Sequence, residues 1–366
     1  MAEGSWGKAA VRDAVSRMRA DGPFYFGIAL YTGFGLAMLA ALGASDRAAY
    51  AIYYVKWAAL FLYFYPVLAL LTDTGLVIHR VDRRRKLAFR TVFTPARVGR
   101  YLAGSALLMA FVFFQGTFTS LKNALVVWQG GFTHDVIHAD IDRILHFGVD
   151  PWRLVEPLVA HPLLRTLTEF SYDVVWFVFC FTALYVFTVS PRTETVRARY
   201  LVAFALTWVL IGNVLAGLYL SAGPAFFGGV TGDEARFGEL VAHLSHGKDG
   251  HFSAAFLQSY LWKAHVLGKA GFGTGISAFP SVHVGLIAMN ALFVYEFSRR
   301  LGIALALYTL FIMASSVALG WHYAIDGYAS VAIVAAMHLA LRRVFAVREG
   351  RKAAAAMPAL EPVTAS

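Results

Sequence analysis

Eight long apolar stretches limit what this chain of 366 residues can fold into. A helix needs about 20 mostly apolar residues to cross the roughly 30 Å hydrocarbon core of a bilayer. Stretches of that kind occur at residues 23–43, 49–71, 101–121, 170–190, 200–221, 281–298, 301–319 and 323–341. The sequence therefore predicts an all-α, polytopic membrane protein with about eight transmembrane helices.

The composition agrees with a place in the membrane. Hydrophobic residues make up 58% of the chain and charged residues 15%, where soluble domains have about 45–50% and about 25%. These values exclude a disordered or nucleic-acid-coating protein and argue against an ordinary soluble enzyme. The single cysteine, Cys180, cannot form an internal disulfide. We expect the bilayer, and no nucleic acid, as a partner.

Lysine and arginine are unevenly divided between the two sides of the predicted bundle. In an eight-span arrangement, 22 of the 32 lie on the side that holds both termini, and nine lie on the other side. Because cytoplasmic loops carry the excess of Lys and Arg, both termini are expected in the cytoplasm. The long segments 122–169 and 222–279 then face outward. We expect a multi-pass protein of a bacterial inner membrane, with its polar chemistry facing the periplasm.

Two polar segments open predicted spans at the outer boundary, and they carry the residue types of a phosphate site. Residues 275–283 precede the sixth span, and residues 320–326 precede the eighth. Pro280 and Ser281 suit the first turn of a helix, whose N-terminus binds anions. Gly275 lets the backbone approach a phosphate closely. His283 is placed to exchange a proton with a phosphate ester.

The second segment holds a histidine and an aspartate at helical spacing. His322 and Asp326 are four residues apart and share a helix face. The aspartate can accept the imidazole N–H, which fixes the tautomer and leaves the other nitrogen nucleophilic. Lys122, at the outer end of the third span, would neutralise phosphate charge. Each residue alone is well explained by packing, but ionisable groups are costly at membrane depth, and their joint occurrence favours a catalytic site.

At these residues the sequence resembles the type 2 phosphatidic acid phosphatase superfamily, which shares a helical core with vanadium haloperoxidases. The segment 280–283 matches the Pro-Ser-x-His of the second signature, and 322–326 matches the His-x-x-x-Asp of the third. Lys122 matches the lysine of the first. The resemblance implies a six-helix catalytic core at residues 100–342. A two-span extension with a basic cytoplasmic loop (1–99) would precede this core, and a disordered cytoplasmic tail (343–366) would follow it.

The resemblance also implies a role for each site residue. His322 would be the nucleophile that forms a phosphohistidine, and Asp326 would orient it. His283 would protonate the leaving group and then activate the acceptor. Lys122, Ser281 and the backbone at Gly275 would hold the phosphate, and no metal or other cofactor is expected.

The chain departs from the superfamily pattern where arginines are usual. Gln129 and Gly130 replace the Arg-Pro of the first signature, and Ser316 replaces the arginine that precedes the histidine of the third. The segments 278–283 and 322–326, with 221–224 and 150–152, are more similar to the inositol phosphorylceramide synthase branch. Other outward cations must then balance the phosphate, and the candidates are Arg143, Arg153, Lys248, Lys263 and Lys269.

The resemblance to this branch implies a sphingolipid inositolphosphotransferase. Such an enzyme moves a phospho-headgroup from a phospholipid donor to a lipid alcohol such as ceramide or diacylglycerol. A lipid phosphate phosphatase is the alternative, since only the acceptor differs. A transporter is a remote alternative, because its ionisable groups would lie near the bilayer midplane. His134 and His138 share a helix face and could form a metal site, although a solvated interfacial helix explains them better.

Overall fold

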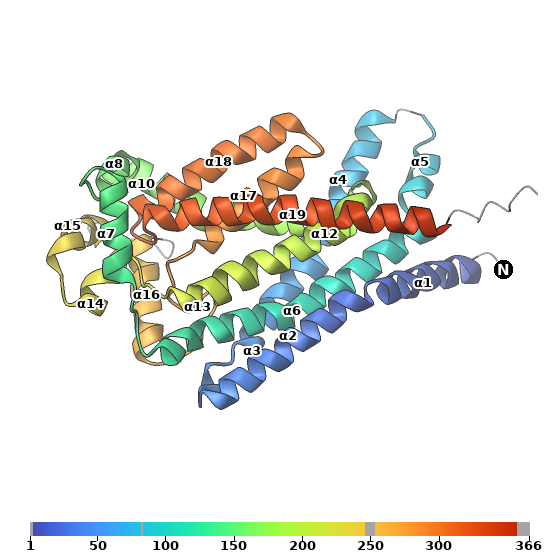
Figure 1. Cartoon of the computed structure of the whole chain (residues 1–366). Coiled ribbons are helices and arrows are strands. Elements are labelled where there is room, and N and C mark those ends of the chain that lie inside the picture. Colours follow the sequence, from blue (N-terminus) through green and yellow to red (C-terminus); the bar gives the residue numbers. More distant parts are fainter. Residues whose placement is uncertain (1–2, 82, 246–252, 357–366) are drawn as a thin grey trace, which may run out of the picture.

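The computed structural model describes residues 3–81, 83–245 and 253–356, and every regular element in these ranges is helical. The elements form an elongated bundle around one long helix, α6 (Pro95–Gln129) (Figure 1). The prediction of an all-α, multi-span membrane protein is confirmed.

Seven helical segments of the described chain are long and apolar enough to cross a bilayer. Three are the single helices α2 (Gly22–Ala41), α6 and α18 (Arg299–Ala318), and a fourth lies within α19 (Ala324–Ala356). The other three are composite: η1 (Ser45–Arg47), α3 (Tyr50–Ala58), η2 (Ala59–Phe64) and α4 (Tyr65–Arg80); α10 (Pro162–Phe170), η3 (Ser171–Val175) and α11 (Trp176–Val189); η4 (Pro191–Thr193), α12 (Glu194–Leu206), η5 (Thr207–Leu215) and α13 (Ala216–Leu218).

The predicted sixth span is shorter than expected. It corresponds to α17 (Val282–Tyr295), which is apolar but has only 14 residues. At 1.5 Å per residue it is about 21 Å long, less than the bilayer core. The helix begins only after Pro280, and Ser281 is its N-cap.

Short helices gather at one end of the bundle, on the left of Figure 1, where α7, α8, α14 and α15 lie. The first turn of α1 (Glu3–Ala20) and the last turn of α19 lie at the opposite end, and α5 (Arg85–Val92) follows α4. We call the first end the outer end. Its short elements are α7 (Asp135–Leu145), α8 (Trp152–Val155), α9 (Pro157–Ala160), η6 (Pro224–Phe226), α14 (Phe227–Thr231), α15 (Ala235–Ser245) and α16 (Ala254–Val266).

The N-terminal helices pack directly on α6. A Cβ at Gly116 would lie 2.6 Å from the ring of Tyr50, and one at Gly35 would lie 2.4 Å from Thr117. These glycines let α3 and α2 approach α6 closely. At the other end of the chain, the tail expected to be disordered from residue 343 is helical as far as Ala356, and residues 357–366 lie outside the described ranges.

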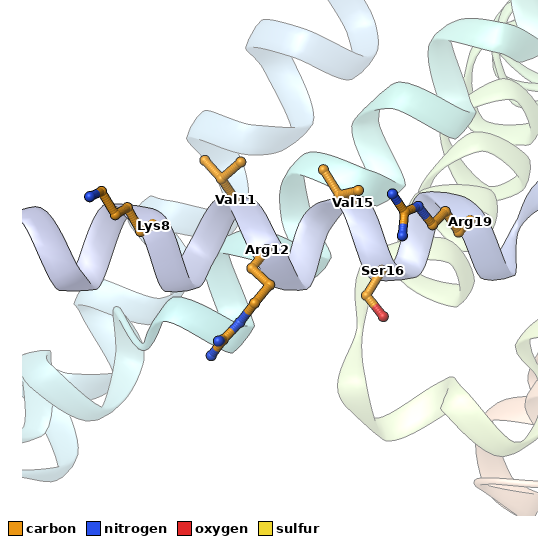
Figure 2. Close-up of a pocket in the computed structure, with 7 residues that line it drawn as sticks. Lys8, Val11, Arg12, Val15, Ser16 and Arg19 are labelled. Carbon is orange, nitrogen blue, oxygen red and sulfur yellow. The ribbon is translucent and has the colours of Figure 1, made fainter.

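A shallow groove runs along the face of α1 that points away from the rest of the bundle (Figure 2). The opposite face, with Ala10 and Ala14, is buried and packs near Gly99 of α6. Gly99 precedes Lys122 by 23 residues, about 35 Å along the helix. This groove is therefore far from the predicted site. It is lined by Gly7, Lys8, Val11, Arg12, Val15, Ser16 and Arg19.

Candidate active site

His322 lies in the short link between α18 and α19, held between an aspartate and a serine. Its Nδ1 is 3.1 Å from Asp326 Oδ2, and its Nε2 is 3.1 Å from Ser281 Oγ. Asp326 Oδ2 also accepts a hydrogen bond from the backbone N–H of Tyr323 at 3.0 Å. Because a carboxylate only accepts, Nδ1 carries the proton and the lone pair lies on Nε2.

The surroundings of His322 keep its imidazole neutral. Burial and, to a smaller extent, the positive charge of Lys122 lower the pKa of His322 to about 3. A neutral ring is the form that can act as a nucleophile. Ser281 donates to Nε2 and accepts from the backbone N–H of Val284 at 3.4 Å. The Ser281 hydroxyl therefore lies between the nucleophilic nitrogen of His322 and the N-terminus of α17, where a phosphate under attack would bind.

His283 lies in the first turn of α17 between two aromatic rings. The centroid of its ring is 4.7 Å from that of Tyr172 and 4.0 Å from that of Trp176, and both pairs are stacked. Trp176 Nε1 also donates to the backbone carbonyl of His283 at 2.9 Å. Aromatic faces attract a protonated ring. Tyr172 and Trp176 belong to η3 and α11, and nothing in the sequence near His283 indicated them.

Lys122 and Gly275 lie in contact. Lys122 is within α6, which continues for seven residues beyond it. Gly275 has φ of +100°, and a Cβ there would lie 2.8 Å from Lys122 Cγ. Both the backbone conformation and the close approach require glycine. Within the described part of the chain, Lys122 has no carboxylate partner and no hydrogen bond from its side chain, although its charge acts on both His322 and His283.

Two aspartates of α7, Asp135 and Asp142, accept hydrogen bonds from the backbone of segments next to the site residues. Asp142 accepts hydrogen bonds from the backbone N–H groups of Ala324 and Ile325 at 2.9 and 3.0 Å, in the first turn of α19. Asp135 accepts from the backbone N–H groups of Ala222 and Gly223 at 2.8 and 2.9 Å. Burial raises the pKa of both carboxyl groups, and these hydrogen bonds oppose that change.

The expectation that His134 and His138 lie on a solvated interfacial helix is wrong for His138, and Asp135 and Asp142 of the same helix are buried as well. Asp135, His138 and Asp142 are each at most 5% exposed. His138 Nδ1 lies 3.0 Å from Ser221 Oγ, and burial lowers the pKa of His138 to about 4. The described residues contain no group of three or more His, Cys, Asp or Glu side chains placed to hold a metal ion.

The segment 221–224 links the two signature segments. The carbonyl of Ser221 accepts from the backbone N–H of Ala278 at 2.8 Å. Gly223 has φ of +97°, and a Cβ there would lie 2.5 Å from the carbonyl oxygen of Trp321. Glycine is therefore required where this segment passes against the link that carries His322.

None of the described cations expected to balance the phosphate lies beside Lys122. Arg143 donates to the carbonyl of Gly148, and Arg153 pairs with Glu239 at 2.7 Å on the surface. Lys263 and Lys269 are exposed, and Lys248 lies outside the described residues. The narrow cleft at Lys122 instead contains Arg47, from the turn between the first two spans.

A match to a family model agrees with this geometry. Residues 137–340, more than half of the chain, match the model described as the PAP2 superfamily. The matched range includes Gly275, Ser281, His283, His322 and Asp326, and Lys122 precedes it. No curated protein and no solved structure matches the chain. Because the match covers more than half of the chain and holds both segments that meet at His322, the chain belongs to the PAP2 superfamily.

Proposed function

We propose that this protein is a membrane lipid phosphotransferase similar to inositol phosphorylceramide synthase, with His322 as its nucleophile. The observation that carries the proposal is the alignment of Ser281, His322 and Asp326, which leaves a neutral nitrogen facing the N-terminus of α17. Membership in the PAP2 superfamily supports a lipid phosphatase or phosphotransferase. The proposed catalytic core is residues 100–342, with residues 1–99 as an N-terminal extension.

In the first step, His322 Nε2 attacks the phosphorus of a phospholipid donor. The N–P bond forms while the P–O bond to the lipid alcohol breaks, and protonated His283 gives its proton to the departing oxygen. The stacked rings of Tyr172 and Trp176 hold the imidazole of His283 in place for this transfer. Lys122, Ser281 and the free N–H groups of the first turn of α17 offset the charge on the phosphoryl oxygens.

In the second step, a lipid hydroxyl attacks the phosphohistidine. His283 takes the hydroxyl proton, the new O–P bond forms, and the N–P bond breaks to restore His322. Water in place of the lipid hydroxyl would make the protein a phosphatase with the same residues. Two contacts support a lipid acceptor, because they place helices of the outer layer over the site: Gln258 of α16 donates to the carbonyl of Leu319, and Ala225 of η6 to that of Gly320. Such cover limits access of water.

Product analysis separates the two reactions. Purified protein is given phosphatidylinositol labelled in its headgroup, with ceramide, with diacylglycerol or with no acceptor. We expect the label to move to the added lipid alcohol, and His322→Ala to form no product. Inositol phosphate as the main product, unchanged by added alcohol, would establish the phosphatase instead.

The proposed site faces the periplasm and the proposed termini lie in the cytoplasm, as the distribution of Lys and Arg indicates. Single cysteines at two exposed positions, Glu156 near the outer end and Arg348 near the end of α19, test this orientation in a Cys180→Ala background. An impermeant thiol reagent should label Glu156→Cys in intact cells with a permeable outer membrane. Arg348→Cys should react only after lysis, and the reverse pattern would invert the topology.

A further inference from the structure

A narrow cleft extends from Lys122 toward the turn between the first two spans. Its lining includes three nitrogen-bearing side chains, Arg47, Lys122 and His265, together with Asn123. The remaining lining residues are Val126, Phe132, Gly275 and Ile276. Among the described residues, no carboxylate lines it. At about 10 Å³ the cleft has room for one water molecule at most, but its lining concentrates positive charge beside Lys122, which favours an anion there.

Arg47 is held at the cleft without being neutralised. Its Nη1 donates to the backbone carbonyl of Asn123, the residue after Lys122, at 2.9 Å. That bond occupies one of the five guanidinium N–H donors. In the described part of the chain Arg47 has no acidic partner, whereas Arg153 and Arg236 at the same end of the bundle are both paired with carboxylates.

The N-terminal hairpin also supports the glycine-rich loop that forms the other side of the cleft. Tyr53 of α3 accepts a hydrogen bond from the backbone N–H of Gly273 at 3.2 Å, and its ring packs on Phe272. The ammonium group of Lys56 lies 3.9 Å from the centroid of Phe272. Asn123 of α6 donates to Thr274 at 3.0 Å. The hairpin, the loop and α6 therefore meet around Arg47 and Lys122.

We infer that Arg47 binds a phosphate-class anion together with Lys122, and so supplies the cation that Gln129 and Ser316 do not provide at the signature positions. This inference rests on the proposed function in one respect: the anion is the phosphate group of the lipid substrate. Gln129 donates instead to the carbonyl of Gly217, and Ser316 to that of Met313. The N-terminal hairpin thereby becomes part of the substrate site.

The test measures binding and turnover separately. Equilibrium dialysis of radiolabelled inorganic phosphate against detergent-purified protein gives a Kd, and headgroup transfer from phosphatidylinositol at fixed ceramide gives KM and kcat. The variants are Arg47→Gln, which keeps a donor for the Asn123 carbonyl but loses the charge, and Arg47→Lys, which keeps the charge. Lys263→Gln removes an exposed cation outside the cleft and is the matched control.

We expect Arg47→Gln to raise the Kd for phosphate and the KM for the donor by roughly tenfold, as for loss of a charged hydrogen bond. Arg47→Lys should recover most of this loss, and Lys263→Gln should change neither value by more than about twofold. An Arg47→Gln protein with the wild-type Kd and KM would overturn the inference. If Arg47→Gln does not fold, Val126→Asp provides the test, because a carboxylate in the cleft must weaken the binding of phosphate. An unchanged Kd for phosphate in Val126→Asp would also overturn the inference.

The two proposals fail in different ways. His322→Ala should transfer nothing, and adding Arg47→Gln to it should still weaken the binding of phosphate. If the wild type itself transfers no headgroup but its phosphate binding depends on Arg47, the proposed reaction is wrong and the anion cleft stands. If the wild type transfers headgroups with no dependence on Arg47, the reaction stands and the inference about Arg47 is wrong.

Discussion

Two histidine–carboxylate pairs of the described chain have the same separation and different surroundings. His322 lies 3.1 Å from Asp326 at the outer end, and His338, in the middle of α19, lies 3.1 Å from Glu296 at the C-terminal end of α17. Glu296 is also paired with Arg199, whose Nη1 donates to it at 2.9 Å. Asp326 has no arginine partner in the described residues, and the nearby cation, Lys122, is unpaired.

The difference extends to the two ends of the bundle. At the end with the first turn of α1 and the last turn of α19, the buried carboxylate of Asp21 is neutralised by an arginine, through two hydrogen bonds from Arg197. At the outer end, the buried carboxylates Asp135 and Asp142 bind backbone N–H groups, and Arg47 and Lys122 stay without acidic partners. A histidine–carboxylate pair therefore becomes a candidate for phosphate chemistry only where unpaired cations and a helix N-terminus face it.

Replacing each histidine in turn should give the largest contrast in turnover. His322→Ala removes the proposed nucleophile, for which no other group can substitute, and should lower kcat by at least about 10⁴-fold. His338→Ala removes a group that faces Glu296 and Arg199, and should leave kcat within about twofold. Steady-state transfer assays on both proteins measure this, with circular dichroism to show that each is folded. Equal losses in the two variants would remove the distinction between the pairs.

Replacing the carboxylate of each pair, Asp326 or Glu296, should give the second-largest contrast in kcat. Asp326→Asn can donate as well as accept, so it no longer fixes the proton of His322 on Nδ1, and kcat should fall by roughly 10²- to 10⁴-fold. Glu296→Gln disturbs a neutralised ion pair, and should lower thermal stability more than it lowers kcat. Assays of kcat and of thermal unfolding in the same detergent compare them. Wild-type kcat in folded Asp326→Asn would show that the aspartate does not act through the tautomer.

The smallest contrast is expected between two aspartates of α7, Asp142 and Asp140, whose replacement should differ in its cost to stability. Asp142→Ala leaves two backbone N–H groups at the start of α19 without their acceptor, which should cost about 2 kcal/mol of stability. It should also lower kcat by roughly tenfold, because the link that carries His322 loses its support. Asp140→Ala removes a surface ion pair with Arg236 and should cost less than about 1 kcal/mol. Thermal unfolding would contradict this assignment if the two variants were equally stable.

Residues close together in the sequence could be interpreted before the structure was seen. The spacing of His322 and Asp326 predicted their pairing, although His322 lies just before α19 and not on its face. Pro280 and Ser281 predicted the start of a helix, which begins after them with Ser281 as its N-cap, so Pro280 lies outside the first turn. Predictions of this kind depend on a few neighbouring residues. The lengths of the apolar stretches predicted the spans for the same reason, except that α17 is too short to match the others.

Contacts between distant segments could not be predicted in this way. Asp142 reaches a helix that starts 182 residues later, and Arg47 reaches the carbonyl of a residue 76 positions away. The aromatic rings that enclose His283 come from a different span. No local pattern records such pairings, because they depend on which helices become neighbours when the bundle packs.

The sequence by itself therefore determined the class of the protein, its spans and the residues of the proposed chemistry, since bilayer thickness and helical repeat act on the chain locally. Only the tertiary structure decided which cations remain free to meet a substrate. A charge is available when packing places it away from every acid, and this holds for Arg47 and Lys122 in the described chain but not for Arg153 or Arg236. That property belongs to the arrangement of the helices, so it exists only once they have packed.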